Sequence, residues 1–183
     1  MGKLGKYFIG YLINGNAKSY HNKLANDIAN KFKIFKISDQ VDPHITFKGF
    51  TILLNKLQLQ ELEVLLKKFC NKNNKTKIKL KGIGHFDNKV IFIEVEPSKE
   101  MKLLYAEFVK ELENLRWVPW NQYDKENIHF HATLAEKFEE DKFERIYKFA
   151  SKEKPDFDLE LDNICILKKP KDKWILYKKF KLN

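Results

Sequence analysis

The sequence predicts an α+β protein with two lobes related by a pseudo-twofold repeat. Two mostly antiparallel sheets should line a central cleft, with helices on the outside. Two observations lead to this prediction. The order of expected helices and strands recurs along the 183 residues, and a His-x-Thr motif occupies the equivalent strand in each copy. The two motif histidines are His44 and His131.

The first copy follows an opening strand, expected over residues 6–13. The next elements are indicated by three kinds of pattern. Apolar residues at helical spacing indicate helices, alternating apolar residues indicate strands, and turn residues indicate the connections. These elements are a helix over 17–32, a strand over 44–50, a helix over 57–70 and a hairpin over 77–84 and 90–95.

The second copy repeats this order. Ser98 is a candidate N-cap for its first helix, and acidic residues in the first turn of its second helix suit the helix dipole. The expected elements are a helix over 98–115, a strand over 128–135, a helix over 138–150 and strands over 159–167 and 174–182.

The chain should therefore be a single domain made of two lobes. The first lobe is expected over residues 14–96 and the second over 97–183, with strand 6–13 in front. Because both lobes lie in one chain, a monomer is a sensible arrangement, and no obligate protein partner is evident.

Composition indicates a globular cytoplasmic protein. Hydrophobic residues make up 43% and charged residues 33%, and no apolar run approaches the ~20 residues that cross a bilayer. The N-terminal residues are typical of a first strand rather than a signal peptide. Cys70 and Cys165 form neither a disulfide framework nor a metal-ligand spacing. No membrane association is expected.

The net charge of +10 suggests an anionic partner such as nucleic acid. This inference must be discounted, because only Arg116 and Arg145 are arginines among the 35 basic residues. A compositional bias towards lysine would give the same charge, and the lysines are scattered along the chain.

The paired motif carries the chemistry. In a strand, residues i and i+2 share a face, so His44 lies beside Thr46, and His131 beside Thr133. Hydroxyls and protonated imidazoles donate hydrogen bonds to phosphate oxygens. Two imidazoles on opposite sides of a phosphorus atom can act as general acid and general base, because the histidine pKa is near neutrality. Neither role requires a metal or a cofactor.

Other residues near the motifs are candidates for substrate contacts. By alternation Lys48 shares the face of His44, and Lys137 follows the second motif. Both could meet phosphates as point charges. Trp120 and Tyr123 lie in the loop before the second motif, where exposed aromatic rings can stack on bases. Tryptophans in such a loop, including Trp117, more often pack as a lid.

The remaining histidines have separate interpretations. His129 lies two residues before His131, on the same expected strand face, so a metal site at this pair is conceivable. The chain offers no compact cluster of further ligands to complete it. His129 would otherwise support His131 or line the cleft. His21, in a helix, and His85, near a hairpin turn, are expected at the surface.

At these residues the chain resembles the two-histidine (2H) phosphoesterase superfamily, which contains 2'-5' RNA ligases and RNA 2',3'-cyclic phosphodiesterases. The resemblance is carried by PHITFKGF at 43–50 and HFHATLA at 129–135. It is supported by GIGHFDNKVIFIEV at 82–95 and WILYKKFKL at 174–182, so it covers nearly the whole chain.

The resemblance implies a bilobal fold with both motifs facing a central cleft, and a reaction without metal. The substrate would be RNA or a small nucleotide with a 2',3'-cyclic phosphate or a 2'-5' linkage. The protein could also catalyse the reverse reaction, 2'-5' ligation. His44 and His131 would be the acid–base pair, and Thr46 and Thr133 would bind phosphate. For cyclic phosphate hydrolysis, His131 would be the base on water and His44 the acid on the leaving 3'-oxygen.

The chain departs from the family pattern at one position. RNA ligase-type members often continue the second motif with an arginine, where this chain has Glu136. An acid there would repel a terminal phosphate, which puts the RNA ligase substrate in doubt. Two alternatives stay open: a binding module that holds RNA or a nucleotide without catalysis, and a metal-dependent hydrolase using His129 and His131.

Overall fold

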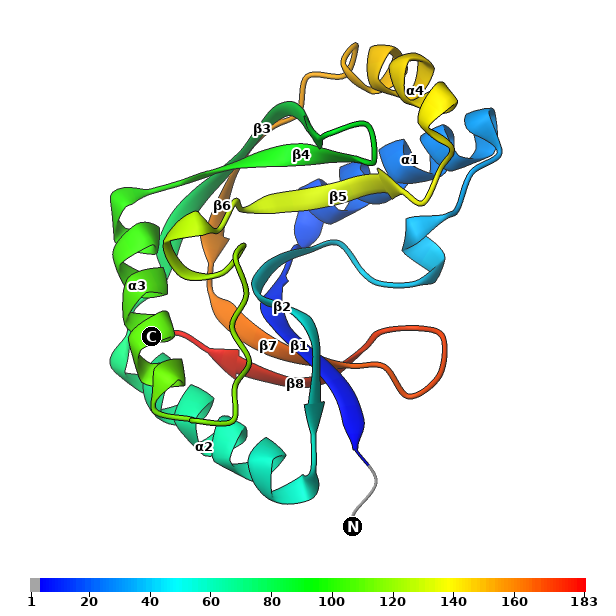
Figure 1. Cartoon of the computed structure of the whole chain (residues 1–183). Helices are drawn as coiled ribbons and strands as arrows, with labels where there is room; N and C mark the ends of the chain where they lie inside the picture. Colours follow the sequence, from blue (N-terminus) through cyan, green and yellow to red (C-terminus); the bar gives the residue numbers. More distant parts are fainter. Residues whose placement is uncertain (1–3) are drawn as a thin grey trace.

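The computed structural model describes residues 4–183, apart from the side chains of residues 50 and 51. Its strands form two four-stranded antiparallel sheets, drawn in the lower and upper halves of Figure 1. The first sheet has the order β2 (His44–Leu54), β1 (Gly5–Leu12), β7 (Asn163–Lys168) and β8 (Ile175–Lys181). The second has the order β5 (His131–Glu136), β4 (Val90–Pro97), β3 (Thr76–Phe86) and β6 (Asp156–Leu161).

The two sheets have the same organisation, as the repeat predicted. In each sheet a His-x-Thr strand forms one edge, and its neighbour is the strand that precedes it in the chain. Thus β2 pairs with β1, and β5 pairs with β4. The α+β fold with two antiparallel sheets is confirmed.

The division of the strands between lobes must be corrected. Each sheet takes strands from both sides of the expected boundary between residues 96 and 97. The hairpin of β3 and β4 completes the sheet of the second motif, whereas β7 and β8 complete the sheet of the first. Periodicity locates elements but carries no information on which distant strands pair, so it could not predict this exchange of strands between the sheets.

The expected strand over 159–167 is two strands in different sheets. β6 pairs with β3 and β7 pairs with β1, and Asp162 alone separates them. β6 alternates acidic and apolar residues and β7 is mostly apolar, but no glycine or proline near Asp162 marks a break between them. The chain crosses from one sheet to the other at this residue.

The second motif strand also begins later than expected. β5 starts at His131, so His129 precedes the strand instead of sharing its face. The expected helix over 138–150 is a 3-10 turn, η3 (Glu140–Lys142), followed by α4 (Phe143–Ala150).

Helices pack outside the sheets, as Figure 1 shows. The capping box of Asn55 with Gln58 begins α2 (Lys56–Lys72). Ser98 accepts a hydrogen bond from the Met101 N–H, which confirms the N-cap of α3 (Lys99–Glu113). The remaining bounds are α1 (Gly15–Phe32) and the 3-10 turns η1 (Ile37–Asp39) and η2 (Lys125–Asn127).

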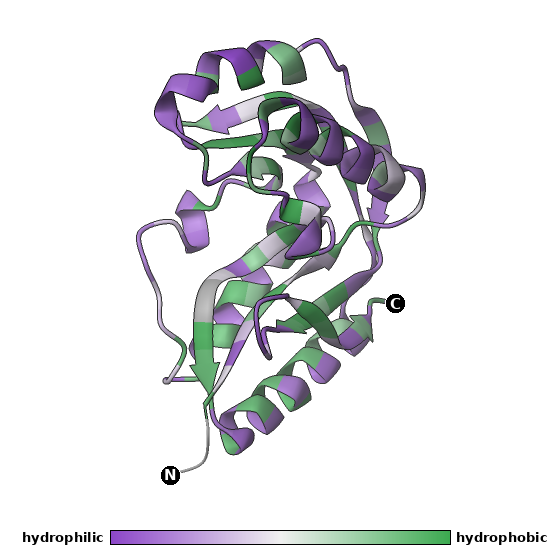
Figure 2. Ribbon diagram, turned by 90° about the vertical axis from the view of Figure 1, so that its right-hand side faces the viewer, coloured by the Kyte–Doolittle hydropathy of each residue, from purple (hydrophilic) through white to green (hydrophobic). Residues whose placement is uncertain are grey.

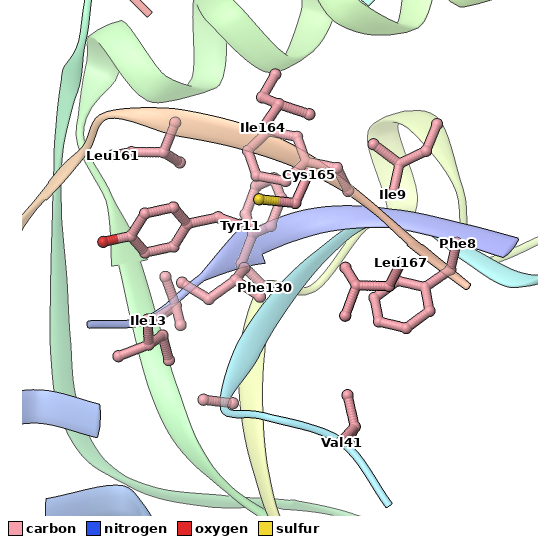
Figure 3. Packing of buried hydrophobic residues seen from close by; sticks show 14 of the residues in the cluster. Phe8, Ile9, Tyr11, Ile13, Val41, Phe130, Leu161, Ile164, Cys165 and Leu167 are labelled. Atoms are coloured by element: carbon pink, nitrogen blue, oxygen red, sulfur yellow. The ribbon is translucent and has the colours of Figure 1, made fainter. Parts of the chain in front are cut away.

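α2 contacts the first sheet and α3 the second, while α1 runs beside β5. Apolar and polar residues alternate along α2, which is banded green and purple in Figure 2. One hydrophobic cluster joins both sheets; Figure 3 shows side chains of β1 and β7 gathered with Phe130. None of the helices described is long and apolar enough to span a membrane.

Candidate active site

The two motif histidines begin the two edge strands. His44 is the first residue of β2 and His131 the first residue of β5. The two strands contact each other, and the charge of His131 acts on the pKa of His44. The fold therefore brings together the two histidines that the sequence singled out.

Both imidazoles are held by the same bond. The Nδ1–H of His44 donates to the Asp42 carbonyl at 2.9 Å, and the Nδ1–H of His131 donates to the His129 carbonyl at 2.7 Å. A carbonyl oxygen can only accept, so this bond assigns the proton to Nδ1 in each neutral ring. The Nε2 atom of each ring is left to accept or carry the mobile proton.

Phenylalanine rings contact both imidazoles. The ring centroid of His44 lies 4.9 Å from that of Phe8, and His131 lies 4.8 and 5.0 Å from Phe86 and Phe92. Burial lowers the pKa of His44 to about 4; the bond to Asp42 opposes this effect, and the charge of His131 adds to it. Burial also lowers the pKa of His131. Both rings are therefore neutral at pH 7 in the free protein.

A β-bulge follows the threonine of each motif. In β2, Thr46 pairs with Gly10 and Lys48 with Ile9, so Phe47 is an extra residue. In β5, Thr133 pairs with Phe92 and Ala135 with Ile91, so Leu134 is extra. Bulges re-aim the side chains that follow them and are common beside active sites.

The first bulge overturns the prediction for Lys48. Partners in register share a face, so Thr46 lies on the face of Gly10, while Lys48 takes the opposite face with Ile9. Its ammonium is 2.8 Å from an Asp124 carboxylate oxygen, and the two side chains are 1% and 5% exposed. Lys48 is therefore a buried structural charge and not a phosphate contact.

The second bulge has the converse effect on Glu136. Glu136 pairs with Val90, which shares the face of Phe92 and hence of Thr133. The acid that departs from the family pattern thus lies on the motif face. Lys137, which has positive φ, places its ammonium 3.3 Å from Glu136 and 4.6 Å from the Phe35 ring centroid.

His129 is paired with an acid that the sequence reading missed. Its Nε2 lies 2.8 Å from a carboxylate oxygen of Glu94, the register partner of His131. A Cβ on Gly84 would approach that carboxylate to 2.2 Å, so glycine leaves the space it occupies. Only the cross-strand register connects these residues, which is why no local motif revealed Glu94.

His21 corrects another prediction. It was expected at the surface but is 3% exposed, and its Nε2–H donates to the Thr133 carbonyl at 2.8 Å. Burial lowers its pKa to about 4. A histidine of α1 thus holds the backbone of the second motif next to the bulge. Its position in the apolar stripe of the helix, between Ala17 and Leu24, was the available signal.

The aromatic residues of the loop before β5 have different environments. Trp120 is half-buried and has the ammonium of Lys48 5.3 Å from its ring centroid, and that of Lys125 at 4.8 Å. Tyr123 is exposed. Trp117 donates to Glu61 of α2 at 2.7 Å, which fits a packed lid. His85 is exposed, as expected.

Within residues 4–183, no group of three or more His, Cys, Asp and Glu side chains is arranged to hold a metal ion. A cavity of about 720 Å³ lies between α3 and the segment that contains η2, and no histidine is among its lining residues. Its lining includes Phe130, whose side chain packs against Phe47 and Tyr105 in the core.

Two motif strands of matched design at the edges of two sheets are the arrangement expected of a two-histidine phosphoesterase. A model of the 2'-5' RNA ligase superfamily matches residues 21–173. The chain belongs to this superfamily. Its members are phosphoesterases, which supports phosphodiesterase-type activity in general. No curated protein sequence matches the chain significantly.

Solved structures share the fold along the whole chain. TT0787 of Thermus thermophilus is 15% identical with a TM-score of 0.63, and 97% of each chain is covered. LigT of Escherichia coli complexed with 3'-AMP is 11% identical with a TM-score of 0.63, covering 100% of this chain and 99% of LigT. Usb1 of Kluyveromyces marxianus is 10% identical with a TM-score of 0.52, with 99% of each chain covered.

Proposed function

We propose that the protein is a metal-independent phosphodiesterase for 2',3'-cyclic phosphates or 2'-5' linkages of RNA or small nucleotides. One observation carries the proposal: His44 and His131 begin matched edge strands, and each has its Nδ1 bound to the carbonyl two residues earlier. The complexes of LigT with 3'-AMP and with ATP support a nucleotide ligand.

In the proposed hydrolysis, Nε2 of His131 takes a proton from water as the water oxygen bonds to phosphorus. The bond from phosphorus to the 3'-oxygen breaks, and the Nε2–H of His44 gives its proton to that oxygen, leaving a 2'-phosphate. Thr46 and Thr133 donate hydrogen bonds to the non-bridging oxygens. The same steps with a 5'-hydroxyl in place of water give 2'-5' ligation. Their microscopic reversal, with the roles of the histidines exchanged, cleaves a 2'-5' linkage: the 3'-oxygen bonds to phosphorus and the 5'-oxygen leaves with a proton.

The acid must be protonated although both rings are neutral in the free protein. A bound phosphodiester anion favours an imidazolium beside it, which raises the pKa of both histidines. Substrate binding therefore brings in the proton that the reaction uses. Glu136 on the motif face disfavours a terminal phosphate dianion more than a singly charged cyclic diester.

A substrate panel read by phosphorus NMR tests the proposal. The panel holds 2',3'-cyclic mononucleotides, short RNAs with a cyclic phosphate end and 2'-5'-linked dinucleotides, each incubated with excess EDTA. Turnover of the cyclic phosphates to 2'-phosphates is expected. NMR shows both the bond broken and the final position of the phosphate.

The alternatives give different results in the same panel. Salt-dependent RNA binding without turnover of any member would establish a binding module instead. Inhibition by EDTA, together with a bound metal in elemental analysis, would favour a hydrolase that uses His129 and His131.

A further inference from the structure

The loop between β7 and β8 is strongly basic. Residues 169–174 read KPKDKW, with three lysines and one aspartate. We name this segment the lysine loop. Lys171 and Lys173 are exposed and Lys169 is half-buried. In Figure 1 it projects, in orange to red, on the same side of the molecule as the light-blue segment that leads into β2.

Three contacts connect the lysine loop to the surroundings of His44. The Trp174 N–H donates to the Gln40 carbonyl at 2.7 Å, in the segment that leads into β2. The Trp174 ring centroid lies 4.8 Å from that of Phe8, and Phe8 in turn lies 4.9 Å from His44. The loop therefore stands two ring contacts from one of the proposed catalytic groups.

The lysines of the loop are available for an anion. None of the three forms an ion pair with any residue that the structure describes, whereas Lys18 is paired with Asp42 and Lys36 with Asp39. Lys169 places its ammonium 5.8 Å from the Trp174 ring centroid. An unpaired ammonium beside a half-buried tryptophan offers both a phosphate contact and a stacking face.

We propose that the lysine loop binds the nucleotides that precede the reacting phosphate in an RNA strand. Lys169, Lys171 and Lys173 contact the backbone phosphates, and the Trp174 ring stacks on a base. This inference rests on the proposed function. It makes the end of an oligonucleotide, rather than a free mononucleotide, the preferred substrate, because a mononucleotide has no preceding phosphates to occupy the loop.

The experiment compares a pentanucleotide ending in a 2',3'-cyclic phosphate with a 2',3'-cyclic mononucleotide. The test variant is Lys169→Gln/Lys171→Gln/Lys173→Gln. The control variant, Lys56→Gln/Lys67→Gln/Lys68→Gln, removes the same charge from α2. α2 lies on the face of the first sheet opposite to Phe8, His44 and Trp174. Its Glu63 accepts a hydrogen bond from Tyr177, and the Tyr177 ring contacts Tyr7. Tyr7 and Phe8 are consecutive strand residues, so they point to opposite faces.

We expect kcat/KM of the test variant to fall about tenfold for the pentanucleotide, with a much smaller change for the mononucleotide. For the pentanucleotide, the slope of log kcat/KM against log salt concentration should become less steep by about 2. Each phosphate contact on a single strand contributes about 0.7 to this slope, and the test variant removes three. The control variant should retain the wild-type ratio of the two rates. Equal losses on both substrates, or no loss on the pentanucleotide, would overturn the inference.

Failure of the proposed function would be seen separately. If the wild type turns over neither substrate, fluorescence anisotropy with a labelled pentanucleotide carrying a 3'-phosphate still compares the variants. Weaker binding by the test variant alone supports the loop as a strand-binding element. Equal binding by the wild type and both variants excludes it.

Discussion

The chemistry of the site depends on the surroundings of single imidazoles. His44 and His131 have the same Nδ1 bond, each contacts at least one phenylalanine ring, and burial lowers the pKa of both. The matched bonds leave Nε2 of each ring as the atom that changes protonation. The pairing was predictable from the repeated His-x-Thr motif. The depressed pKa values were not, because they arise from burial, which depends on how distant segments pack.

The lowered pKa values predict an acidic optimum for kcat/KM. This parameter follows the free enzyme, in which one histidine must be protonated and the other neutral. Because both pKa values lie below the ordinary 6.5, the protonated acid is lost as the pH rises above them. We expect kcat/KM for a cyclic mononucleotide to peak below about pH 6.5. At higher pH it should decrease, with a slope that approaches a tenfold loss per pH unit.

The profile of kcat should peak at a higher pH, since the bound phosphodiester raises both pKa values. Steady-state kinetics from pH 4 to 9 in buffers of constant ionic strength measure both profiles. A value of kcat/KM that keeps rising above pH 7.5 contradicts the proposed protonation states.

His21 predicts a pH dependence of stability. Burial lowers its pKa to about 4 in the folded protein, whereas the unfolded chain has the ordinary histidine value of 6.5. As the pH falls from 6.5 towards 4, the unfolded chain binds a proton that the folded chain excludes, so stability decreases. His21→Ala should cost about 1–3 kcal/mol at pH 7.5, because the Thr133 carbonyl loses its partner.

The difference between wild type and His21→Ala should shrink as the pH falls, since the variant lacks this titrating group. Urea unfolding at pH 7.5, 6 and 5 measures it, with the exposed His85→Ala as the control. Parallel stability curves for wild type and His21→Ala would show that His21 is not held neutral by folding.

Among the structural elements, the two bulges decide which side chains reach the motif face. They turn Lys48 away from His44 and bring Glu136 to the side of Thr133. Simple alternation along the sequence gives the opposite result for both residues. A bulge has no reliable signature in one sequence, because apolar residues such as the extra Phe47 and Leu134 are equally at home in regular strands.

The buried Lys48–Asp124 pair fastens the loop before β5 to the first motif strand. Asp124 also accepts hydrogen bonds from the backbone and side chain of Asn121. Removal of one member leaves the other charge buried, which costs about 3–5 kcal/mol. We therefore expect Lys48→Met to lower the free energy of unfolding by about 3 kcal/mol.

The double variant Lys48→Met/Asp124→Leu should recover part of this loss, because no isolated charge remains. Lys79→Met is the control: its pair with Asp156 is exposed to water, which screens the attraction, so its loss should change stability far less. Urea unfolding at pH 7 measures the series. Equal costs for Lys48→Met and Lys79→Met would refute the account of a buried fastening pair.

Across the whole molecule, the exchange of strands binds the two halves into one unit. The hairpin of β3 and β4 completes the second sheet, and the C-terminal strands complete the first. The sequence predicted most elements, the repeat and the motif strands from local periodicity. It could not predict the sheet partners, the split at Asp162 or the Glu94–His129 pair, which depend on contacts between distant residues.

In the proposed mechanism two histidines, one from each sheet, act on one phosphate. The most direct test of this mechanism is kcat/KM for a 2',3'-cyclic phosphate, in EDTA, for His44→Ala, His131→Ala and the double variant. Each single variant should lose about 10²–10⁴-fold. The double variant should lose much less than the product of the two single losses, because the residues act as a unit.

The control is His85→Ala, which removes an exposed histidine with a similar Nδ1 bond to a carbonyl. It should keep wild-type activity. Wild-type kcat/KM in either single variant would contradict the account.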